Sequence, residues 1–306
     1  MKKQVLLIFN PKAGLDRRRL KPEDIINRFR RDEYSFDLHI TKGEKDATEI
    51  VKAFGEQNDL IICCGGDGTL NEIINGVMCL NKKIPIGYIP MGSTNDLATT
   101  IGIPADINMA TEIIKAGHTE GYDIGHFNDR YFSYVASFGP GSRMSYSTPQ
   151  KLKNKLGHGA YLLNGFVLEI IANLKEVKPT HIKIEYDGGV LDDIFYFVSI
   201  SSSNSVAGIF NFSNSNVKLN DGLFEMMLVK NLKTPLDSFP MLAKIIKKDY
   251  DGKNLILLKT SKVKLTFDEH HPWTLDGEYG GEHQEVIFEA KQKGVELFCP
   301  GNEMFW

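Results

Sequence analysis

The chain has 306 residues, which favours two domains, and its 42% hydrophobic and 25% charged residues are typical of a globular enzyme. A formal net charge of −3 argues against non-specific binding to nucleic acid, so no nucleic-acid partner is expected. The four cysteines include no CxxC pair, and no apolar run is long enough to span a bilayer, so the sequence favours a cytoplasmic protein.

The first part of the chain alternates between strand and helix patterns. Strands are expected at residues 5–9, 34–40, 60–64 and 84–89, and helices at 17–31, 46–54, 70–80, after 96, and at 106–116. Short connections between alternating strands and helices predict an α/β domain whose parallel sheet is covered by helices on both faces. We place this N-terminal domain at residues 1–121.

The pattern changes after residue 121, where strands follow one another with turn signals between them. Strands are expected at residues 130–138, 181–186, 193–201, 223–229, 262–267, 285–288 and 295–298, with helices only near 159–174 and 235–247. This pattern predicts a mainly antiparallel β-sandwich as the C-terminal domain, residues 122–306. Whether the final segment returns to the first domain stays open.

A glycine-rich turn, Gly65-Gly66-Asp67-Gly68-Thr69, joins the strand at 60–64 to a helix. Glycines let a backbone approach an anion closely, and the free N–H groups of a helix start bind phosphate oxygens. An aspartate at this place would repel a phosphate, so Asp67 is interpreted as binding Mg²⁺, a metal-bound water or a hydroxyl. The alternative is a plain turn in which Asp67 caps the helix.

Two other expected strands end in similar loops. Asn10-Pro11-Lys12-Ala13-Gly14 follows the first strand, and Pro90-Met91-Gly92-Ser93-Thr94-Asn95-Asp96 follows the strand at 84–89. Ligands of open parallel sheets bind beyond the carboxyl ends of the strands, so three such loops favour a nucleotide phosphate site. The chain has neither a GxxxxGK[ST] nor a GxGxxG motif, which excludes an ordinary P-loop or dinucleotide fold.

These three motifs, in this order and spacing, resemble the diacylglycerol kinase catalytic-domain family, which includes sphingosine and ceramide kinases and bacterial soluble lipid kinases. The resemblance extends through residues 122–125, 220–223 and 275–278, although the Gly-Gly-Asp-Gly-Thr element is shared with NAD kinases. It implies a two-domain kinase that binds ATP in a cleft between the domains. It also implies a lipid hydroxyl as acceptor, with diacylglycerol, converted to phosphatidic acid, as the first expectation.

The resemblance assigns the nucleotide to the loops of the first domain, with Lys12 as a cation for the phosphates. The residues that it implies as contacts of ATP are Asn10, Pro11, Lys12, Ala13, Gly14, Thr41, Gly65, Gly66, Asp67, Gly68, Thr69, Leu70, Asn71, Glu72, Ser93 and Thr94.

The resemblance also implies a metal site and a general base in the second domain. A structural Mg²⁺ would be held by the Asp221 carboxylate and the carbonyls of Lys218 and Leu223, where a simple Asn-Asp-Gly hairpin is the alternative. Asp276 is the first expected base and Glu278 the second, because phosphoryl transfer needs a carboxylate to orient and deprotonate the attacking hydroxyl. With Asp67, these two complete the expected catalytic residues; a hairpin at Asp276-Gly277 is the alternative.

The chain departs from the bacterial pattern at residues 138–142 and 207–213, so the lipid that accepts the phosphate stays open. The apolar helix near 159–174 either admits an acyl chain or packs on the sheet. His270 and His271 are expected on a surface turn. Basic clusters at 17–21 and 151–155 suggest peripheral contact with the anionic inner membrane face. Homodimerisation, an NAD kinase-like activity and a regulator without turnover stay open as alternatives.

Overall fold

The computed structural model describes residues 2–14, 20–30, 33–93, 95–139, 179–202, 205–206, 210–211, 218–230 and 254–301. The chain divides into two compact units, unit 1 with Met1–Ile124 and Gln292–Trp306, and unit 2 with Gly125–Lys291. The predicted strand-rich, two-domain layout is confirmed. The last segment of the chain, from Gln292 onward, belongs to unit 1.

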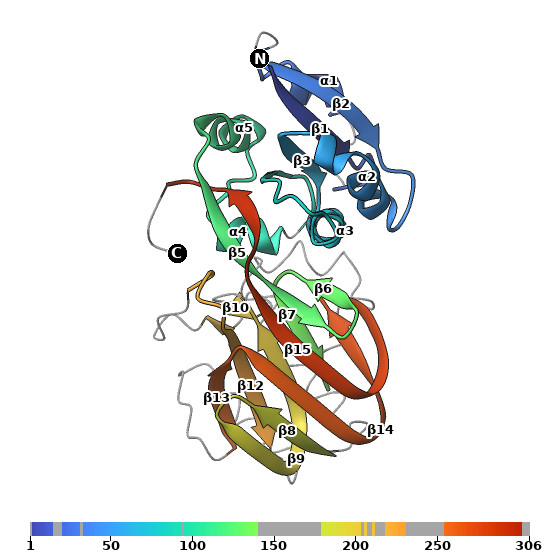
Figure 1. Ribbon diagram of the computed structural model, residues 1–306, viewed down its shortest axis with the longest axis vertical. Coiled ribbons are helices and arrows are strands. Elements are labelled where there is room, and N and C mark those ends of the chain that lie inside the picture. Colours follow the sequence, from blue (N-terminus) through green and yellow to red (C-terminus); the bar gives the residue numbers. More distant parts are fainter. Residues whose placement is uncertain are drawn as a thin grey trace, which may run out of the picture. The chain divides into compact units, whose positions relative to one another are not determined.

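Unit 1 contains parallel strands (Figure 1). They are β1 (Lys3–Phe9), β2 (Tyr34–Ile40), β3 (Leu60–Gly65) and β4 (Ile86–Pro90), with the end of β15 (Glu278–Phe298) beside β4. Their order is β2–β1–β3–β4–β15, and each of these neighbouring pairs is parallel. All residues of β3 and β4 are buried, as expected for inner strands of a parallel sheet.

The helices of unit 1 connect these strands. They are α1 (Pro22–Ile26), α2 (Asp46–Phe54), the short 3₁₀ helix η1 (Gly55–Gln57), α3 (Asp67–Val77), α4 (Asp96–Thr100) and α5 (Ile107–Ala116). Glycines allow close contacts, because a Cβ on Gly76 of α3 would lie 2.6 Å from Cβ of Val51 on α2. A Cβ on Gly87 of β4 would likewise lie 2.7 Å from the Ile114 side chain of α5. Small residues therefore set how closely α3 packs on α2 and α5 packs on β4.

Unit 2 is built of antiparallel strands. They are β6 (Arg130–Phe132), β7 (Val135–Phe138), β8 (Thr180–Tyr186), β9 (Gly189–Ser201), β12 (Phe224–Lys230), β13 (Leu255–Thr260) and β14 (Lys262–Leu275), with a separate pair β10 (Ser205–Val206) and β11 (Phe210–Asn211). The main path runs β13–β12–β9–β7–β14–β15, and β8 pairs with both β9 and β14. Strand β5 (Thr119–Phe127) leads from unit 1 into unit 2.

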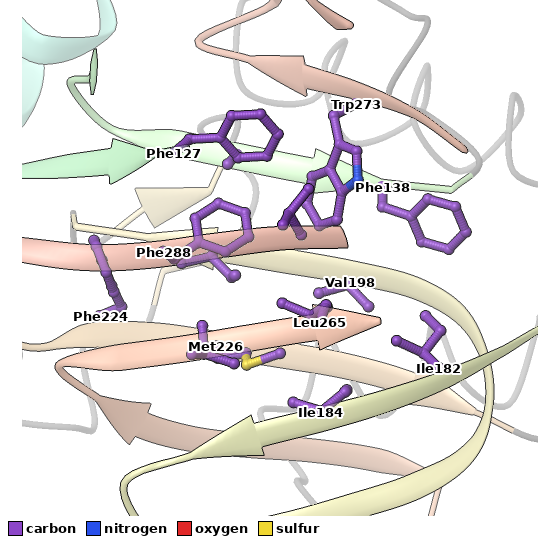
Figure 2. Packing of buried hydrophobic residues seen from close by; sticks show 14 of the residues in the cluster. Phe127, Phe138, Ile182, Ile184, Val198, Phe224, Met226, Leu265, Trp273 and Phe288 are labelled. Atoms are coloured by element: carbon purple, nitrogen blue, oxygen red, sulfur yellow. The ribbon is translucent and has the colours of Figure 1, made fainter. Parts of the chain in front are cut away.

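One apolar cluster fills unit 2, and its side chains come from strands far apart in the sequence (Figure 2). Phe138 of β7, Val198 of β9 and Trp273 of β14 lie in register on neighbouring strands and all belong to this cluster. Side chains alternate between the two faces of a strand. The next residue on each of these strands therefore lies on the opposite face.

Several expected elements need correction. Residues 130–138 form two strands, because Ser133 and Tyr134 between them turn their N–H groups to Asp276. Residues 285–288 and 295–298 belong to the single strand β15, since the polar stretch between them is also paired or extended. His270 and His271 are strand residues of β14, not turn residues, and the His271 ring contacts Phe138 and Phe267. Strands β5 and β13 were missed.

The helices expected near 159–174 and 235–247 lie outside the described residues. So do most of the departing segments at 138–142 and 207–213, and both basic clusters except Leu20 and Lys21.

Candidate active site

Four loops meet at the carboxyl edge of the unit 1 sheet. Each neighbouring pair of strand ends is joined by a backbone hydrogen bond just beyond the strands. Thr41 donates to the carbonyl of Phe9 at 2.9 Å, and Asn10 donates to that of Cys64 at 2.8 Å. Met91 donates to the carbonyl of Gly65 at 2.7 Å. The structure thus brings together, at one edge, the loops that the sequence assigned to the nucleotide.

Glycines are required where these loops touch. Gly14 has φ +71°, a left-handed conformation, and a Cβ there would lie 2.3 Å from the carbonyl oxygen of Met91. A Cβ on Gly92 would lie 2.7 Å from Cα of Gly66. The loops after β1, β3 and β4 therefore pack backbone against backbone, an arrangement that larger residues would force apart.

Asn10 fixes the first loop to the helix that follows β3. Its Nδ2 donates to Oγ1 of Thr69 at 2.8 Å, and its Oδ1 accepts from the backbone N–H of Lys12 at 2.9 Å. The side chain of Lys12 extends into solvent from this anchored loop. The loop that carries the exposed Lys12 is therefore anchored to α3, and a cation on such a loop is suited to a phosphate.

Helix α3 begins at the glycine turn without a side-chain cap. Its N-cap is Gly66, and Asp67 is the first helical residue, half-buried. The N-cap of α3 is therefore Gly66, which has no side chain, and not Asp67, for which the sequence left a capping role open. The first N–H groups of a helix have no intrahelical partner and bind anions well. This helix start can accordingly bind a phosphate.

Glu72, one turn further along α3, has a structural task. Its carboxylate accepts hydrogen bonds from the N–H groups of Lys45 (2.8 Å) and Ala47 (3.0 Å), at the start of α2. Burial raises the pKa of Glu72, and these two backbone donors oppose the rise. Glu72 thus holds the beginning of α2, and with it the loop that carries Thr41.

The loop after β4 is held together by Asn95. No role was assigned to this residue from the sequence. Asn95 has φ +53°, its Oδ1 accepts from the N–H of Gly92 (2.9 Å), and its Nδ2 donates to the Gly92 carbonyl (3.0 Å). Tyr88 also donates to Oδ1, at 3.2 Å. Ser93 is exposed on this closed loop, whereas Thr94 lies outside the described residues. The sequence could have indicated this role, because an asparagine that lies shortly after a glycine and just before a helix often hydrogen-bonds the backbone of its own turn.

Asp276 occupies the turn between β14 and β15 in unit 2. Its Oδ2 accepts from the backbone N–H (2.5 Å) and the hydroxyl (2.8 Å) of Ser133, and its Oδ1 accepts from the N–H groups of Tyr134 and Val135, both at 3.0 Å. Its own N–H donates to the Val135 carbonyl, and its φ is +49°. Burial raises the pKa of Asp276, and the four donors oppose this. The carboxylate is therefore held in one orientation, as a positioned base requires.

Glu278, the second candidate base, begins β15 two residues later. It lies opposite Leu275 in the hairpin and is exposed. Ser133, which the sequence did not single out, supplies two of the donors to Asp276; nothing in the sequence pattern points to it.

The turn at 218–223 carries the expected metal ligands. Asp221 Oδ1 accepts from the Leu223 N–H at 3.1 Å, and its Oδ2 lies 3.8 Å from Nζ of Lys259. The same ammonium lies 3.1 Å from Oε1 of Glu225, a side chain that is 1% exposed. Burial raises the pKa of Glu225 to about 7. The charge of Lys259 opposes this rise, and the charge of Asp221 adds to it.

Neither oxygen of Glu225 makes a hydrogen bond of good geometry in the described chain. Carboxylate and carbonyl oxygens are the ligands that Mg²⁺ and Ca²⁺ prefer, so this turn fits such a cation. The described residues contain no group of three or more His, Cys, Asp or Glu side chains arranged for a metal, so backbone carbonyls would have to supply the remaining ligands.

Among the helices of the described segments, none has the length and apolar character needed to cross a bilayer.

Comparison with known proteins gives a consistent result. Residues 4–127 match the diacylglycerol kinase catalytic domain. The chain is 34% identical to a diacylglycerol kinase of Bacillus subtilis (strain 168), over 91% of each chain. It is 32% identical to a diacylglycerol kinase of Staphylococcus aureus (strain MRSA252), over 99% of this chain and 94% of the relative. A crystal structure from Bacillus anthracis str. Sterne, of a provisionally assigned diacylglycerol kinase, superimposes with a TM-score of 0.79 at 27% identity, covering 98% and 96% of the two chains.

Proposed function

Because the chain belongs to the diacylglycerol kinase family and is a lipid kinase, we propose that it transfers the γ-phosphate of ATP to the free hydroxyl of diacylglycerol, forming phosphatidic acid. The observation that carries this proposal is the set of loops at the carboxyl edge of the unit 1 sheet. Such an edge is where open parallel sheets bind their ligands.

In this proposal, the nucleotide phosphates bind at the start of α3, between the Asn10–Gly14 loop and the Gly92–Ser93 loop. The helix N–H groups and the Lys12 ammonium stabilise the negative charge of the phosphates. Asp67, half-buried beside these groups, takes a hydroxyl or the cation that accompanies ATP, since a bare carboxylate would repel the phosphates. Thr41, after β2, and Ser93, after β4, contact the nucleotide from the carboxyl edge of the same sheet.

Asp276 acts as the general base toward the acceptor hydroxyl. The proposal rests on its fixed orientation and on burial, which raises its pKa and so makes the carboxylate a stronger base. The proton of the acceptor hydroxyl moves to Asp276 as the hydroxyl oxygen attacks the γ-phosphorus and ADP leaves. Glu278 is the second candidate for this role.

Mg²⁺ is proposed at the 218–223 turn, held by the Asp221 carboxylate and by the carbonyls of Lys218 and Leu223. A cation there would neutralise the charge of Asp221 and order the turn; Lys259 neutralises part of the same charge. Glu225, whose buried carboxylate shares the Lys259 ammonium with Asp221, adds a second carboxylate near this turn and supports the assignment.

The lipid acceptor is proposed to be taken from a membrane surface, by peripheral contact with anionic lipid. Basic clusters at 17–21 and 151–155 support it, each engaged cation contributing about 1 kcal/mol near an anionic surface. Sedimentation with vesicles of varied anionic content should show binding that weakens with salt. If the bound fraction changed neither with the anionic lipid content nor with the ionic strength, this contact would be contradicted.

The function is tested by incubating the protein with γ-labelled ATP, Mg²⁺ and a panel of diacylglycerol, monoacylglycerol, sphingosine, ceramide and NAD. Label in phosphatidic acid supports the proposal. Label in the NAD product would identify an NAD kinase instead. Label in no product, with ATP bound, would identify a nucleotide-binding regulator without turnover.

A further inference from the structure

The peptide groups that hold the carboxylate of Asp276 are themselves hydrogen-bonded at their other ends. The peptide between Ser133 and Tyr134 donates its N–H to Oδ1 of Asp276 at 3.0 Å, and the peptide between Tyr134 and Val135 donates to the same oxygen at 3.0 Å. The N–H and C=O of a trans peptide point in opposite directions, so the carbonyls of these two peptides point away from the carboxylate. Groups that bind the two carbonyls can therefore act on Asp276.

Two buried serines at the end of β9 bind these carbonyls. Oγ of Ser202 donates to the carbonyl of Ser133 at 3.0 Å, and Oγ of Ser201 donates to that of Tyr134 at 2.9 Å. The backbone N–H of Ser202 also donates to the Tyr134 carbonyl, at 3.1 Å. The two serines are 0% and 1% exposed. Two chains of hydrogen bonds thus run from a serine hydroxyl, through one peptide group, to the carboxylate of the proposed base.

The surrounding structure keeps both chains in place. Ser201 of β9 is the strand partner of Val135 of β7, and the N–H of Asp276 donates to the Val135 carbonyl at 2.8 Å. Phe132, just before the segment that carries the donors, is fully buried and stacks on Phe224 with ring centroids 5.8 Å apart. The segment is therefore fixed at both ends, and the two serines bind the peptide groups between them.

Hydrogen bonds in a chain strengthen one another. A donor at an amide carbonyl polarises the amide, so its N–H becomes a stronger donor, and a low local dielectric constant increases the effect. Burial raises the pKa of Asp276, and the N–H groups of the segment oppose this rise. Loss of a serine hydroxyl should therefore weaken these donors, loosen the carboxylate and raise its pKa further.

Resting on the lipid kinase function proposed above, we infer that Ser201 and Ser202 are positioning residues, each of which holds the carboxylate of Asp276 through one peptide group, in the orientation that receives the proton of the acceptor. Neither serine takes part in proton transfer. Ser199, two residues earlier on β9, provides a matched control. It is 0% exposed, and its Oγ has no hydrogen-bond partner in the described structure.

The kinetic test combines each serine variant with a variant of the base, at a pH well above the pKa of the base. Ser201→Ala and Ser202→Ala should each lower kcat for diacylglycerol about threefold to tenfold, and KM for ATP should stay within about twofold of wild type. In the Asp276→Asn background the same changes should alter the residual kcat less than about twofold, because the serines act through the base. Ser199→Ala should change kcat less than about twofold in either background.

Equal losses of kcat in the two backgrounds would give the serines a general structural role and overturn the inference. Unchanged kcat in both serine variants would overturn it as well. Ser201→Ala is the milder substitution, because the Tyr134 carbonyl keeps the N–H of Ser202. It carries the test if Ser202→Ala does not fold, as judged by thermal melting.

The pKa of Asp276 supplies a readout that needs no turnover. It is followed in ¹³C-labelled protein through the carboxyl resonance that Asp276→Asn removes. The pKa should rise by about 0.5 to 1 in Ser201→Ala and Ser202→Ala, since weaker N–H donors stabilise the charged form less. It should not change in Ser199→Ala.

The charged residues beside this turn stay the same in every variant. They are Arg130 of β6, which donates to the Tyr279 carbonyl at 3.1 Å, and Glu278 of β15. A rise in the pKa of Asp276 therefore reports the lost hydroxyl. An unchanged pKa in a folded Ser201→Ala would overturn the inference. If the pKa rises as expected but the wild type labels no lipid, the hydrogen-bond chains stand and the proposed function is defeated.

Discussion

At the scale of single residues, four hydrogen-bond donors from Ser133, Tyr134 and Val135 hold the carboxylate of Asp276 in one orientation. Asp276 could be proposed as the base from sequence because its turn, residues 275–278, carries the family resemblance. Ser133 could not, because the hydrogen bonds that orient Asp276 join residues more than 140 positions apart. Glu72 is a second example: no local pattern shows that its carboxylate accepts hydrogen bonds at the start of α2.

Asp67→Ala should lower the rate of phosphoryl transfer by about 100-fold or more. The reason is that the half-buried carboxylate at the start of α3 binds a metal or a hydroxyl in the proposed mechanism. Its melting temperature should stay within about 3 °C of wild type, since it is not the N-cap of α3. Kinetics and thermal melting check this, with the exposed Glu112→Gln as the control expected to change neither. Normal turnover in a normally folded Asp67→Ala would remove the nucleotide-site assignment.

Turnover should also fall at acid pH through protonation of the base. Burial raises the pKa of Asp276, so the carboxylate takes up its proton at a higher pH than an exposed aspartate would. The rate is therefore full above that raised pKa and is lost as pH falls through it. A pH–kcat profile of the wild type should show this limb, and the residual rate of Asp276→Asn should lack it. An unchanged limb in the variant assigns the titration to another group.

At the scale of elements, local periodicity predicted the buried strands and amphipathic helices of unit 1, of which helix 46–54 was found with the same ends. The long strands of unit 2 were harder. Strand β15 contains a polar stretch at 289–294 that shows no apolar alternation, so the sequence divided this strand into two. Strand β5 was missed because Gly121 and Gly125 interrupt its apolar pattern.

The backbone packing of the nucleotide loops predicts a sharp difference between two glycines of unit 1. Gly14→Ala should lower the free energy of unfolding by about 1–3 kcal/mol, because φ is +71° and the new Cβ meets the Met91 carbonyl. It should also raise KM for ATP, since the loops must separate. Gly43→Ala is the matched control, because no atom lies within 4 Å of its Cβ. Chemical denaturation measures both; similar losses at the two sites would contradict this packing argument.

At the scale of the whole molecule, the chain enters unit 2 at Gly125 and returns to unit 1 at Gln292. The loops proposed to bind the nucleotide belong to unit 1, whereas Asp276 belongs to unit 2. The sequence could assign motifs to two domains because each motif is local. The acceptor lipid could be named from sequence only through the family resemblance, because the sheet of unit 2 is formed by pairing of the distant strands β7, β9 and β14, which no local pattern shows.

The central claim is that Asp276 of unit 2 is the base for transfer of a phosphate bound by unit 1. It is tested by the single-turnover rate at which preformed enzyme–ATP complexes transfer labelled phosphate to diacylglycerol. Asp276→Asn keeps the size of the side chain but cannot take a proton, so transfer should fall by about two to four orders of magnitude. ATP affinity in the same titration should be unchanged, because its contacts come from the other unit. A near-normal rate in Asp276→Asn with a lost rate in Glu278→Gln would move the base to Glu278. Near-normal rates in both variants would contradict the mechanism.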